Sequence, residues 1–571
     1  MNIATESGAP AVVLGIDYGT ESGRALLVDV ASGAELGSAV SAYSHAVLDH
    51  ELPDGVPLPP DFALQDPDDY LRVFDVVPGL LRSTGIRPEQ VIGVGTDFTA
   101  CTVLPTLADG TPLCRLEPFR SNPHAWVKLW KHHAGQPQAD RINELGQRRQ
   151  EEFIARYGGR YSAEWLFSKL LETLEKAPAV YRAAERFVEA ADWIVWQLCG
   201  EERRNTCTAG YKAMWFAESG GFPPREFFAG LNPDFAGALD KLAGRYYALG
   251  SAAGGLTPAS AARLGLLSGT PVAIGNVDAH GAVPACTVVE PARMVMIMGT
   301  SICHMLLGEE KRQVEGMCGV VRDGIIPGVW GYEAGQSAVG DIFAWFFRAA
   351  APESAAAAAR AAGQSLPDWL EAQARGIAPG ESGLLALDWW NGNRSILVNH
   401  HLSGLLLGCT LQTRPEEIYR ALLESTAFGT LAIIEAMEMA GVRVRELVAC
   451  GGLPHRNPLL MQIYADVTGR EIRIAASEQT CALGAAMHAA VAAGPERGGY
   501  ADIRQAAGAM ARLRPHAFLP DPAAHAIYRE LYREYLAVHD YFGRGANPVM
   551  EHLRRLRLER HSASGGAASA S

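Results

Sequence analysis

Two stretches far apart in the chain share one pattern: an apolar run, a Gly-Thr pair and a second apolar run. The first is VVLGIDYGTESGRALLVDV at residues 12–30, and the second is MVMIMGTSICHMLLG at residues 294–308. Each predicts two strands joined by a Gly-rich turn, which is a hairpin and not a strand–loop–helix unit. The repeat therefore predicts two lobes with related cores, with a boundary near residues 280–290.

Length and charge narrow the class of protein. A chain of 571 residues suggests two to four domains, and its 48% hydrophobic and 20% charged residues are ordinary for a globular enzyme. The net charge of −13 argues against binding a nucleic-acid backbone or an anionic membrane surface through bulk electrostatics. A small anion such as ATP is still compatible with a locally positive site.

The cysteines and the N-terminus predict a cytoplasmic protein. The ten cysteines include no CxxC pair, so we expect reduced, mostly buried thiols. The first apolar run, AVVLGI, follows no basic segment and stops at Asp17, and no apolar stretch reaches the length of about 18 residues that a membrane span needs. We therefore expect neither a signal peptide nor a transmembrane helix.

Apolar periodicity and turn signals predict the other elements. Strands are expected at Val12–Ile16, Arg24–Val30, 34–48, 91–105, 271–278 and 445–452. Helices are expected from residue 66 to a kink or end at Pro78, over most of 124–200, at 349–363, from a capping box at Thr413–Glu416 to about 440, and at 457–469, 481–494 and 523–541. The small residues of 481–494 would permit close packing, and the tail 561–571 is expected to be disordered.

The first Gly-rich turn, D17-Y-G-T-E-S-G-R24, has the chemistry of an anion site. Its glycines let backbone N–H groups approach a phosphate, Thr20 adds a hydroxyl donor, and Arg24 adds charge. Asp17 at a strand end could hold Mg²⁺ through water molecules. The same residues would also suit a plain hairpin turn in which the glycines only supply positive φ angles.

Three further segments could carry chemistry, and each has an ordinary structural alternative. M298-G-T-S301 is either a second anion turn or a break in a buried strand. A449-C-G-G-L-P-H-R-N-P458 ends a strand in two glycines that a flat ring could face, or it is a loop with a helix cap. In G275-N-V-D-A-H280, Asp278 is either a general base at a strand end or a helix N-cap.

Absent motifs remove several enzyme classes. The chain has no GxxxxGK[ST] P-loop, no strand–GxGxxG–helix unit, no HExxH and no GxSxG. The doublets His132-His133 and His400-His401 are interpreted as surface or packing histidines and not as metal ligands.

The order of four motifs, G-I-D-Y-G-T, then G-N-V-D, then M-G-T-S, then C-G-G-L with N-P-L-L-M-Q, resembles the FGGY carbohydrate kinases over residues 12 to about 490. Other stretches are similar to family members that act on L-ribulose: GTDFTACTVLP (95–105), AWVKLWKHHA (125–134), TAGYKAMW (208–215), GYEAGQSAVGD (331–341) and NPLLMQIYADVTG (457–469). The resemblance implies the α/β fold of the actin and hexokinase superfamily, with two ribonuclease H-like lobes around a central cleft. The N-terminal lobe, 1–286, would bind the sugar, and the C-terminal lobe, 287–560, would bind the nucleotide and carry a helical extension.

The resemblance also assigns roles on the nucleotide side. ATP and Mg²⁺ would be the cofactors, with the metal held by Asp17. The phosphates would be bound by Thr20, Arg24, Gly299 and Thr300, and the nucleotide wall would be Gly340, Gly451, Gly452 and Asn457. Asn457 is the expected adenine contact, with Arg456 as a competitor. Glu21 departs from the glycerol kinases, which carry a second Thr there, and weighs against that branch.

On the sugar side, the resemblance makes Asp278 the general base for the terminal hydroxyl of a ketopentose. The pocket would be lined by Ala100, Trp130, Lys212, Asp278 and Glu333. Surface exposure of Lys212, an ion pair of Glu333 with a nearby arginine and core packing of Trp130 are the structural alternatives.

The implied reaction is the ATP-dependent phosphorylation of L-ribulose to L-ribulose 5-phosphate, in arabinose catabolism. D-ribulose or xylulose is the alternative acceptor, and a homodimer is compatible with the family. The superfamily also contains ATPase chaperones and sugar sensors. A sensor without kinase activity would lack the base, and Asp278 is present; a regulator would add a basic nucleic-acid-binding segment, which this acidic chain does not show.

Overall fold

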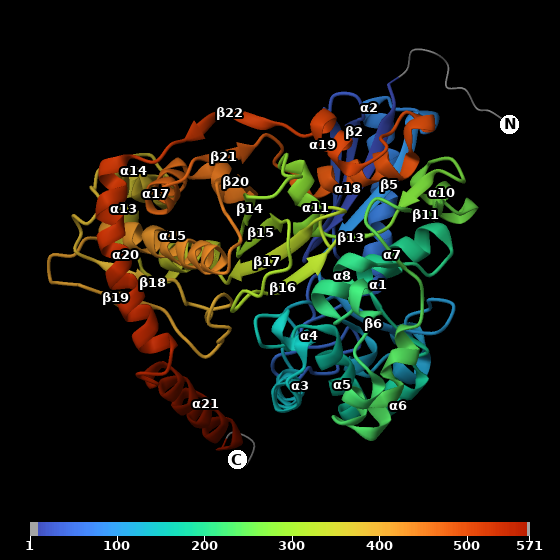
Figure 1. Cartoon of the computed structure of the whole chain (residues 1–571), viewed down its shortest axis with the longest axis horizontal. Helices are drawn as coiled ribbons and strands as arrows, with labels where there is room; N and C mark the ends of the chain where they lie inside the picture. Colours follow the sequence, from blue (N-terminus) through green and yellow to red (C-terminus); the bar gives the residue numbers. More distant parts are fainter. Residues whose placement is uncertain (1–9, 568–571) are drawn as a thin grey trace.

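Two mixed sheets, one from each half of the chain, form the framework of the molecule (Figure 1). The structure, a computed structural model, describes residues 10–567. In order, the strands of the first sheet are β11 (Ala252–Gly255), β12 (Pro271–Ala273), β5 (Val91–Phe98), β1 (Val12–Tyr18), β2 (Ser22–Asp29) and β3 (Glu35–Ala42), with β13 (Asn276–Val277) also paired to β5. Those of the second are β16 (Gly319–Arg322), β17 (Trp330–Gln336), β15 (Ile302–Gly308), β14 (Arg293–Met298), β20 (Glu446–Cys450), β21 (Ile472–Ala475) and β22 (Leu513–Phe518).

The two sheets repeat one topology. In the first, β1, β2 and β3 form an antiparallel meander, and β1 pairs in parallel with β5, which pairs in parallel with β12. In the second, β14, β15 and β17 form the meander, and β14 pairs in parallel with β20, which pairs in parallel with β21. The structure therefore confirms the internal repeat, and the two Gly-Thr turns are equivalent hairpin turns, β1–β2 and β14–β15.

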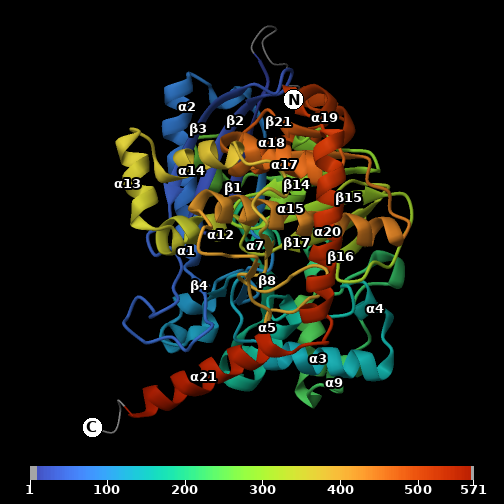
Figure 2. The ribbon, with the colours of Figure 1, turned by 90° about the vertical axis from the view of Figure 1, so that its left-hand side faces the viewer.

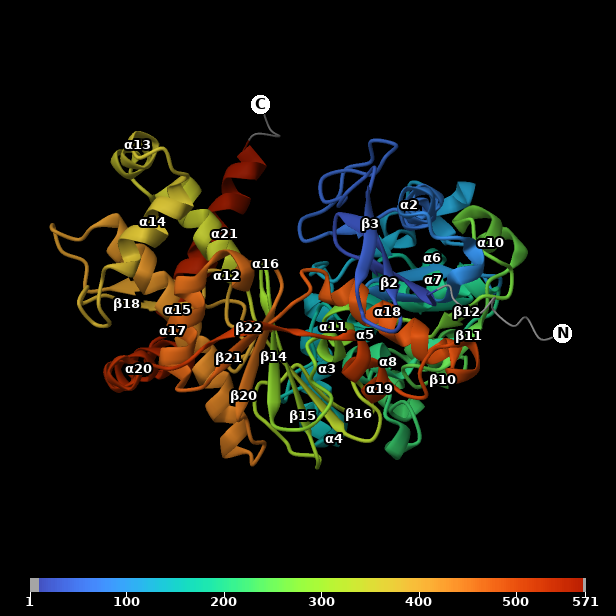
Figure 3. The same cartoon turned by 90° about the horizontal axis from the view of Figure 1, so that it is seen from above.

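Helix α18 (Thr480–Ala493) covers the first sheet although it comes from the second half of the chain (Figures 1 and 3). Its backbone lies directly on two glycines: a Cβ atom on Gly15 would be 2.0 Å from the carbonyl oxygen of Ala482, and one on Gly95 would be 2.0 Å from that of Ala485. The small residues of α18 permit this approach, as the sequence predicted. The helix also touches α11 (Asp278–Ala285), where a Cβ atom on Gly484 would be 1.9 Å from the carbonyl oxygen of Gly281.

A smaller sheet lies within the first half of the chain, below the first sheet in Figure 1. Its strands, in order, are β4 (Leu64–Gln65), β7 (Val127–Lys128), β6 (Val103–Thr106) and β8 (Arg186–Glu189). The helices of this half are α1 (Pro67–Arg72), α2 (Val77–Thr84), α3 (Gln136–Arg149), α4 (Glu152–Ala155), α5 (Leu166–Lys176), α6 (Pro178–Ala183), α7 (Ala190–Cys199), α8 (Thr206–Lys212), α9 (Arg225–Ala229) and α10 (Pro258–Leu264), and a short pair is formed by β9 (Arg204–Asn205) and β10 (Tyr246–Tyr247). Residues 124–200 are thus mostly helical, apart from β7, β8, their connections and the irregular segment 156–165 between α4 and α5.

The second half of the chain contains further helices, some of which pack on the second sheet. They are α12 (Val339–Trp345), α13 (Glu353–Ala361), α14 (Leu366–Arg375), α15 (Pro415–Met439), α16 (Gly452–Arg456), α17 (Pro458–Thr468), α19 (Ile503–Met510, which contacts α18), α20 (Pro522–Gly543) and α21 (Val549–Ala567), with the hairpin β18 (Leu385–Leu387) and β19 (Leu405–Leu407). The long helix α20 runs beside α15 (Figure 2), where the Tyr528 hydroxyl donates to Glu424 at 2.8 Å. The predicted tail 561–571 overlaps the end of α21, and residues 568–571 lie outside the described part.

Local signals set most helix ends as predicted, with one correction. The first helix ends before Pro78: α1 stops at Arg72, a 3₁₀ turn spans Val73–Val76, and α2 begins at Val77 with Pro78 in its first turn. The capping box of α15 does not join Thr413 and Glu416. Instead the backbone N–H of Arg414 donates to the Glu417 carboxylate at 2.7 Å, because Pro415 occupies the first helical position and moves the cap to the residue before it.

The predicted boundary at 286/287 falls in the connection between α11 and β14. Within residues 10–567, no helix is both long enough and apolar enough to cross a bilayer.

Candidate active site

Three carboxylates meet where strands of the first sheet end. Asp17 is the next-to-last residue of β1, and its register partner on the parallel strand β5 is Asp97. Asn276 on β13 pairs with Asp97, and two residues later Asp278 begins helix α11. The carboxyl ends of parallel strands share one edge of a sheet, which is the usual place for a ligand site in α/β folds.

Burial raises the pKa of all three acids. The pKa of Asp278 rises to about 7, because burial and the charge of Asp17 disfavour its ionised form, while the N–H of Ala279, 2.6 Å away, opposes the shift. Burial also raises the pKa of Asp17, against the influence of Asp97 and Arg24. The pKa of Asp97 is raised well above its ordinary value, by burial and by Asp17 beside it. A partly buried carboxyl with a pKa near 7 can accept a proton at neutral pH.

The acidic edge suits a hydrated Mg²⁺ ion. In residues 10–567, no group of three or more His, Cys, Asp or Glu side chains could hold a metal by itself. Mg²⁺ in kinases is commonly held by one or two carboxylates, water and substrate phosphates. Asp17 is partly exposed, and both carboxylate oxygens of Asp97 are buried without a hydrogen-bond partner among the described residues. The donor set therefore fits the ion that the sequence predicts.

Lys212 and Glu333 form a buried ion pair between the two halves of the chain. The Lys212 ammonium, at the end of α8, lies 2.7 Å and 2.8 Å from the two carboxylate oxygens of Glu333 on β17. Burial alone would lower the pKa of Lys212, but Glu333 raises it above its usual value, and Lys212 holds the pKa of Glu333 well below its usual range. His280, two residues after Asp278, lies 3.4 Å from Glu333. The pair excludes a surface position for Lys212.

Trp130 joins the predicted sugar pocket to the predicted phosphate turn. Its indole N–H donates to the Thr20 hydroxyl at 3.1 Å. The backbone carbonyl of Thr20 accepts a hydrogen bond of 2.6 Å from the Gln65 amide, and Tyr70 holds Gln65 in turn at 2.7 Å. Trp130 and Thr20 are both partly buried, as is Ala100 after β5. Arg24 pairs with Asp17 across the β1–β2 ladder, which places its charge beside the turn.

The second sheet brings its predicted residues together at its own turn. Gly299 and Thr300 are exposed in the β14–β15 turn, and the N–H of Gly340 donates to the Thr300 carbonyl at 2.9 Å. A Cβ atom on Gly340 would lie 2.6 Å from the Gly299 carbonyl oxygen, so glycine is needed for this contact. The N–H of Gly299 donates within the turn, to the Ser301 carbonyl at 3.0 Å, so the exposed Thr300 hydroxyl is a donor that this turn can offer to an anion.

Gly451 and Gly452 follow β20 beside the same turn. Gly451 has a φ of +91°, and a Cβ atom there would lie 2.5 Å from the Met298 carbonyl oxygen. Gly452 is exposed, and a Cβ atom there would meet nothing within 4 Å. The structure thus requires a glycine at Gly451, whereas packing alone leaves Gly452 free to vary.

The side chain of Asn457 makes structural hydrogen bonds within the second half of the chain. Its side-chain oxygen caps α17 by accepting the N–H of Leu460 at 2.8 Å, and its side-chain nitrogen donates to Tyr419 at 3.0 Å. The side chain is buried, whereas the competitor Arg456 is exposed. An adenine contact by Asn457 stays a prediction, and the geometry favours its structural alternative.

Sequence reasoning missed two residues of this site. Asp97 lies within GTDFTACTVLP, and an acid at the end of a fully buried strand was the signal that could have identified it. His280 lies within G-N-V-D-A-H, but its contact with Glu333 depends on the packing of the second sheet against α11. No local pattern could have indicated that contact.

Known proteins resemble the chain over nearly its whole length. The C-terminal domain of the FGGY family of carbohydrate kinases matches residues 294–493. A ribulokinase from Geobacillus thermodenitrificans is 56% identical over 545 residues, covering 95% of this chain and 96% of the relative. A ribulokinase from Mycolicibacterium smegmatis is 51% identical over 569 residues, covering 99% and 100%.

Solved structures share the fold at lower identity. A xylulose kinase from Rhodospirillum rubrum superposes with a TM-score of 0.73 at 22% identity, covering 92% of this chain and 98% of that one. A Plasmodium falciparum glycerol kinase with ADP has a TM-score of 0.70 at 15% identity, covering 93% and 99%. These likenesses confirm the predicted two-lobed architecture. Together with the near full-length identity to the ribulokinases, they show that the chain belongs to the FGGY family of carbohydrate kinases.

Proposed function

We propose that this carbohydrate kinase transfers the γ-phosphoryl group of ATP to the terminal hydroxyl of L-ribulose, giving L-ribulose 5-phosphate for arabinose catabolism. The observation that carries the proposal is the carboxyl of Asp278, which has a pKa of about 7 and lies at the same edge of the first sheet as Asp17. The choice of ribulose is supported by relatives named ribulokinase at 51–56% identity. D-ribulose or xylulose is the alternative acceptor.

Asp278 would take the proton of the attacking hydroxyl. A general base works best when its pKa lies near the working pH, because it is then both ionised and basic. The bond between the γ-phosphorus and the bridging oxygen of ATP breaks as the sugar oxygen attacks, and the proton moves to Asp278. Phosphoryl transfer needs alignment and charge neutralisation more than covalent help from the protein.

Lys212 and Glu333 would recognise the hydroxyl groups of the sugar. The ammonium group can only donate and the carboxylate can only accept, so the pair offers both kinds of hydrogen bond at a fixed separation. Their mutual contact holds both side chains in place before the sugar arrives. Trp130 would cover an apolar face of the sugar, next to Ala100.

Backbone and side-chain donors from both lobes would surround the phosphates. The hydroxyls of Thr20 and Thr300 and the charge of Arg24 suit that task, and Gly299, which has no side chain, would let a phosphate approach the second turn closely. Asp17 would hold Mg²⁺, with Asp97 beside it; when bound, the ion would neutralise charge on the phosphates. Gly340, Gly451 and Gly452 would form the wall for the nucleotide.

We further propose that the enzyme works in the cytoplasm, because it consumes ATP and because its ten cysteines are all free thiols. The net charge of −13 supports small-molecule substrates without a nucleic-acid or membrane partner. A homodimer stays a prediction.

The test is ADP release with Mg-ATP and a panel of L-ribulose, D-ribulose, L-xylulose, D-xylulose and glycerol, with Asp278→Asn beside the wild type. A preference for L-ribulose that disappears in the variant is the expected result. Equal activity on all four ketopentoses would contradict the substrate assignment and keep the reaction. No sugar-stimulated ADP release from folded protein would overturn the kinase proposal in favour of a sensor or a simple ATPase.

A further inference from the structure

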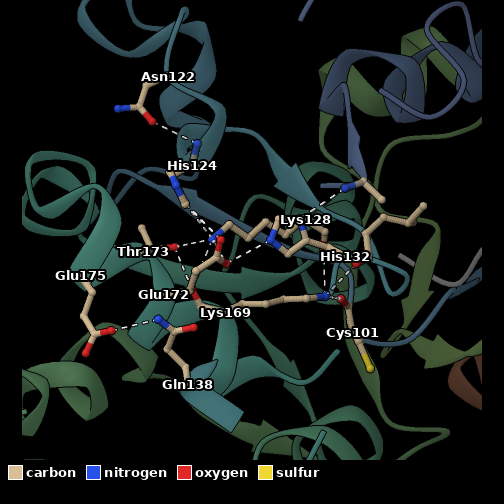
Figure 4. A network of polar contacts seen from close by, with 12 residues as sticks. Cys101, Asn122, His124, Lys128, His132, Gln138, Lys169, Glu172, Thr173 and Glu175 are labelled. Carbon is tan, nitrogen blue, oxygen red and sulfur yellow. Dashed lines mark hydrogen bonds and ion pairs between the residues drawn. The ribbon is translucent and has the colours of Figure 1, made fainter. Parts of the chain in front are cut away.

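Lys169 is a buried lysine whose ammonium group holds backbone carbonyls from two separate segments (Figure 4). It lies on α5 and is only 1% exposed. Its Nζ donates to the carbonyl oxygen of Cys101, to that of Leu129 at 2.8 Å and, more weakly, to that of Lys128 at 3.4 Å. One side chain thus ties the β5–β6 connection to the segment that follows β7.

Both segments carry residues of the proposed sugar pocket. Cys101 directly follows Ala100, and Leu129 directly precedes Trp130. The backbone at Cys101 has a φ of +61°, a left-handed conformation that a side chain other than glycine adopts only when its surroundings enforce it. The hydrogen bond from Lys169 to the Cys101 carbonyl lies at this strained residue.

Burying the ammonium group of Lys169 costs free energy, which argues that this lysine has a functional role. Its neighbour Lys128 is compensated by Glu172 at 2.7 Å, whereas Lys169 forms no ion pair in the part of the chain that the structure describes. Burial lowers the pKa of Lys169 to about 8, against the influence of Glu189 and Glu164. An unpaired buried ammonium is expensive, and a methionine could fill similar space at less cost. A methionine could not form the hydrogen bonds that Lys169 donates to the backbone carbonyls.

We propose that Lys169 is a positioning residue that sets the shape of the sugar pocket by fixing the backbone at Ala100 and Trp130. The inference rests on the proposed function, since it concerns the pocket assigned there to the ketopentose. The nucleotide side should be affected much less, because Gln65 and Tyr70 hold the backbone of the phosphate turn at Thr20, and Trp130 contacts only the Thr20 hydroxyl.

The test compares Lys169→Met with wild type and with Arg420→Met. Arg420 is also buried, but its partners Glu424 and Tyr528 lie in the second half of the chain, away from both segments. In Lys169→Met we expect the KM for L-ribulose to rise about tenfold, with kcat and the KM for ATP changing less than about twofold. Arg420→Met should lose stability without this split. Sugar binding measured by calorimetry should weaken as the KM rises.

Hydrogen exchange supplies a measurement that needs no sugar. Amide exchange in residues 99–103 and 128–131 should accelerate in Lys169→Met and stay unchanged in Arg420→Met. Unchanged exchange and an unchanged sugar KM would overturn the inference, as would a parallel rise in the KM for ATP. If Lys169→Met does not fold, Lys169→Gln, whose side chain is shorter, neutral and polar, is judged by the same criteria. An inactive wild type would defeat the proposed function alone, because the exchange experiment still decides the role of Lys169.

Discussion

The Lys212 ammonium and the Glu333 carboxylate meet at 2.7 Å and 2.8 Å, and this contact joins helix α8 of the first half to strand β17 of the second. The pair therefore belongs to the interface between the lobes as well as to the proposed sugar pocket. Its place in the interface predicts an effect on stability, and its place in the pocket predicts an effect on sugar binding.

Removing one partner of the pair should cost more than removing both. Lys212→Met leaves Glu333 as an uncompensated buried charge, so we expect a loss of about 3–5 kcal/mol in the free energy of unfolding. The double variant Lys212→Met/Glu333→Gln should recover part of this loss and still fail to bind the sugar. Urea denaturation and calorimetric sugar titration measure the two effects. If the loss in the double variant equals the sum of the losses in Lys212→Met and Glu333→Gln, a direct interaction between the two side chains is contradicted.

The activity should depend on the ionisation of Asp278. Only the carboxylate can accept the proton of the sugar hydroxyl, so kcat/KM for the sugar should rise with pH and level off above an acid limb near pH 7. Below that limb we expect about a tenfold loss per pH unit. A profile of kcat/KM between pH 5 and pH 9 measures this. A flat profile through pH 6 would exclude Asp278 as the base with the raised pKa.

The same carboxyl should weaken the fold as pH rises. Its pKa of about 7 in the folded protein lies above its ordinary value of 3.8, so between these pH values the folded state binds the additional proton. Stability from this group is complete below about pH 3.8 and is lost as pH rises through 7. Asp278→Asn, which cannot ionise, should raise the melting temperature more at pH 8 than at pH 5. An equal shift at both values would show that the ionisation is not responsible.

The nucleotide-side glycines should separate into two classes. In Gly340→Ala the added Cβ would meet the Gly299 carbonyl oxygen at 2.6 Å, so both the melting temperature and the affinity for ATP should fall. In Gly452→Ala the added Cβ meets nothing within 4 Å, so the melting temperature should hold while the KM for ATP rises if the nucleotide lies there.

Gly508→Ala is the matched control for these variants. Gly508 lies on the exposed face of helix α19, and a Cβ atom there also meets nothing within 4 Å. Alanine should stabilise that helix by up to about 1 kcal/mol and leave the kinetics unchanged. A KM for ATP that is unaltered in Gly452→Ala would remove Gly452 from the proposed nucleotide wall.

Local patterns predicted what local physics determines. The hairpin turns at Gly19 and Gly299, the Asn457 cap and the close-packing helix α18 follow from turn chemistry and side-chain size, and the structure contains each of them. The predicted position of the capping box of α15 was wrong by one residue. Glu416 and Glu417 are both acids that could form it, and only Glu417 accepts the hydrogen bond from the Arg414 N–H.

Contacts between residues far apart in the sequence could not be predicted in this way. The pairing of Asp17 with Asp97 depends on the register of β1 and β5, and the contact of His280 with Glu333 depends on how the second sheet lies against α11. Lys169 sits in a helix whose sequence gives no sign that its ammonium group would reach the carbonyls of Cys101 and Leu129.

The path of helix α18 has a consequence for synthesis. The first sheet begins at Val12, but the helix that seals the glycine-lined face of β1 and β5 ends only at Ala493. During synthesis on a ribosome, this face of the first sheet therefore stays uncovered until most of the chain has emerged. A gene cut at residue 286 would encode a fragment that lacks its own cover, and supplying residues 287–571 as a second chain would be the way to complete it.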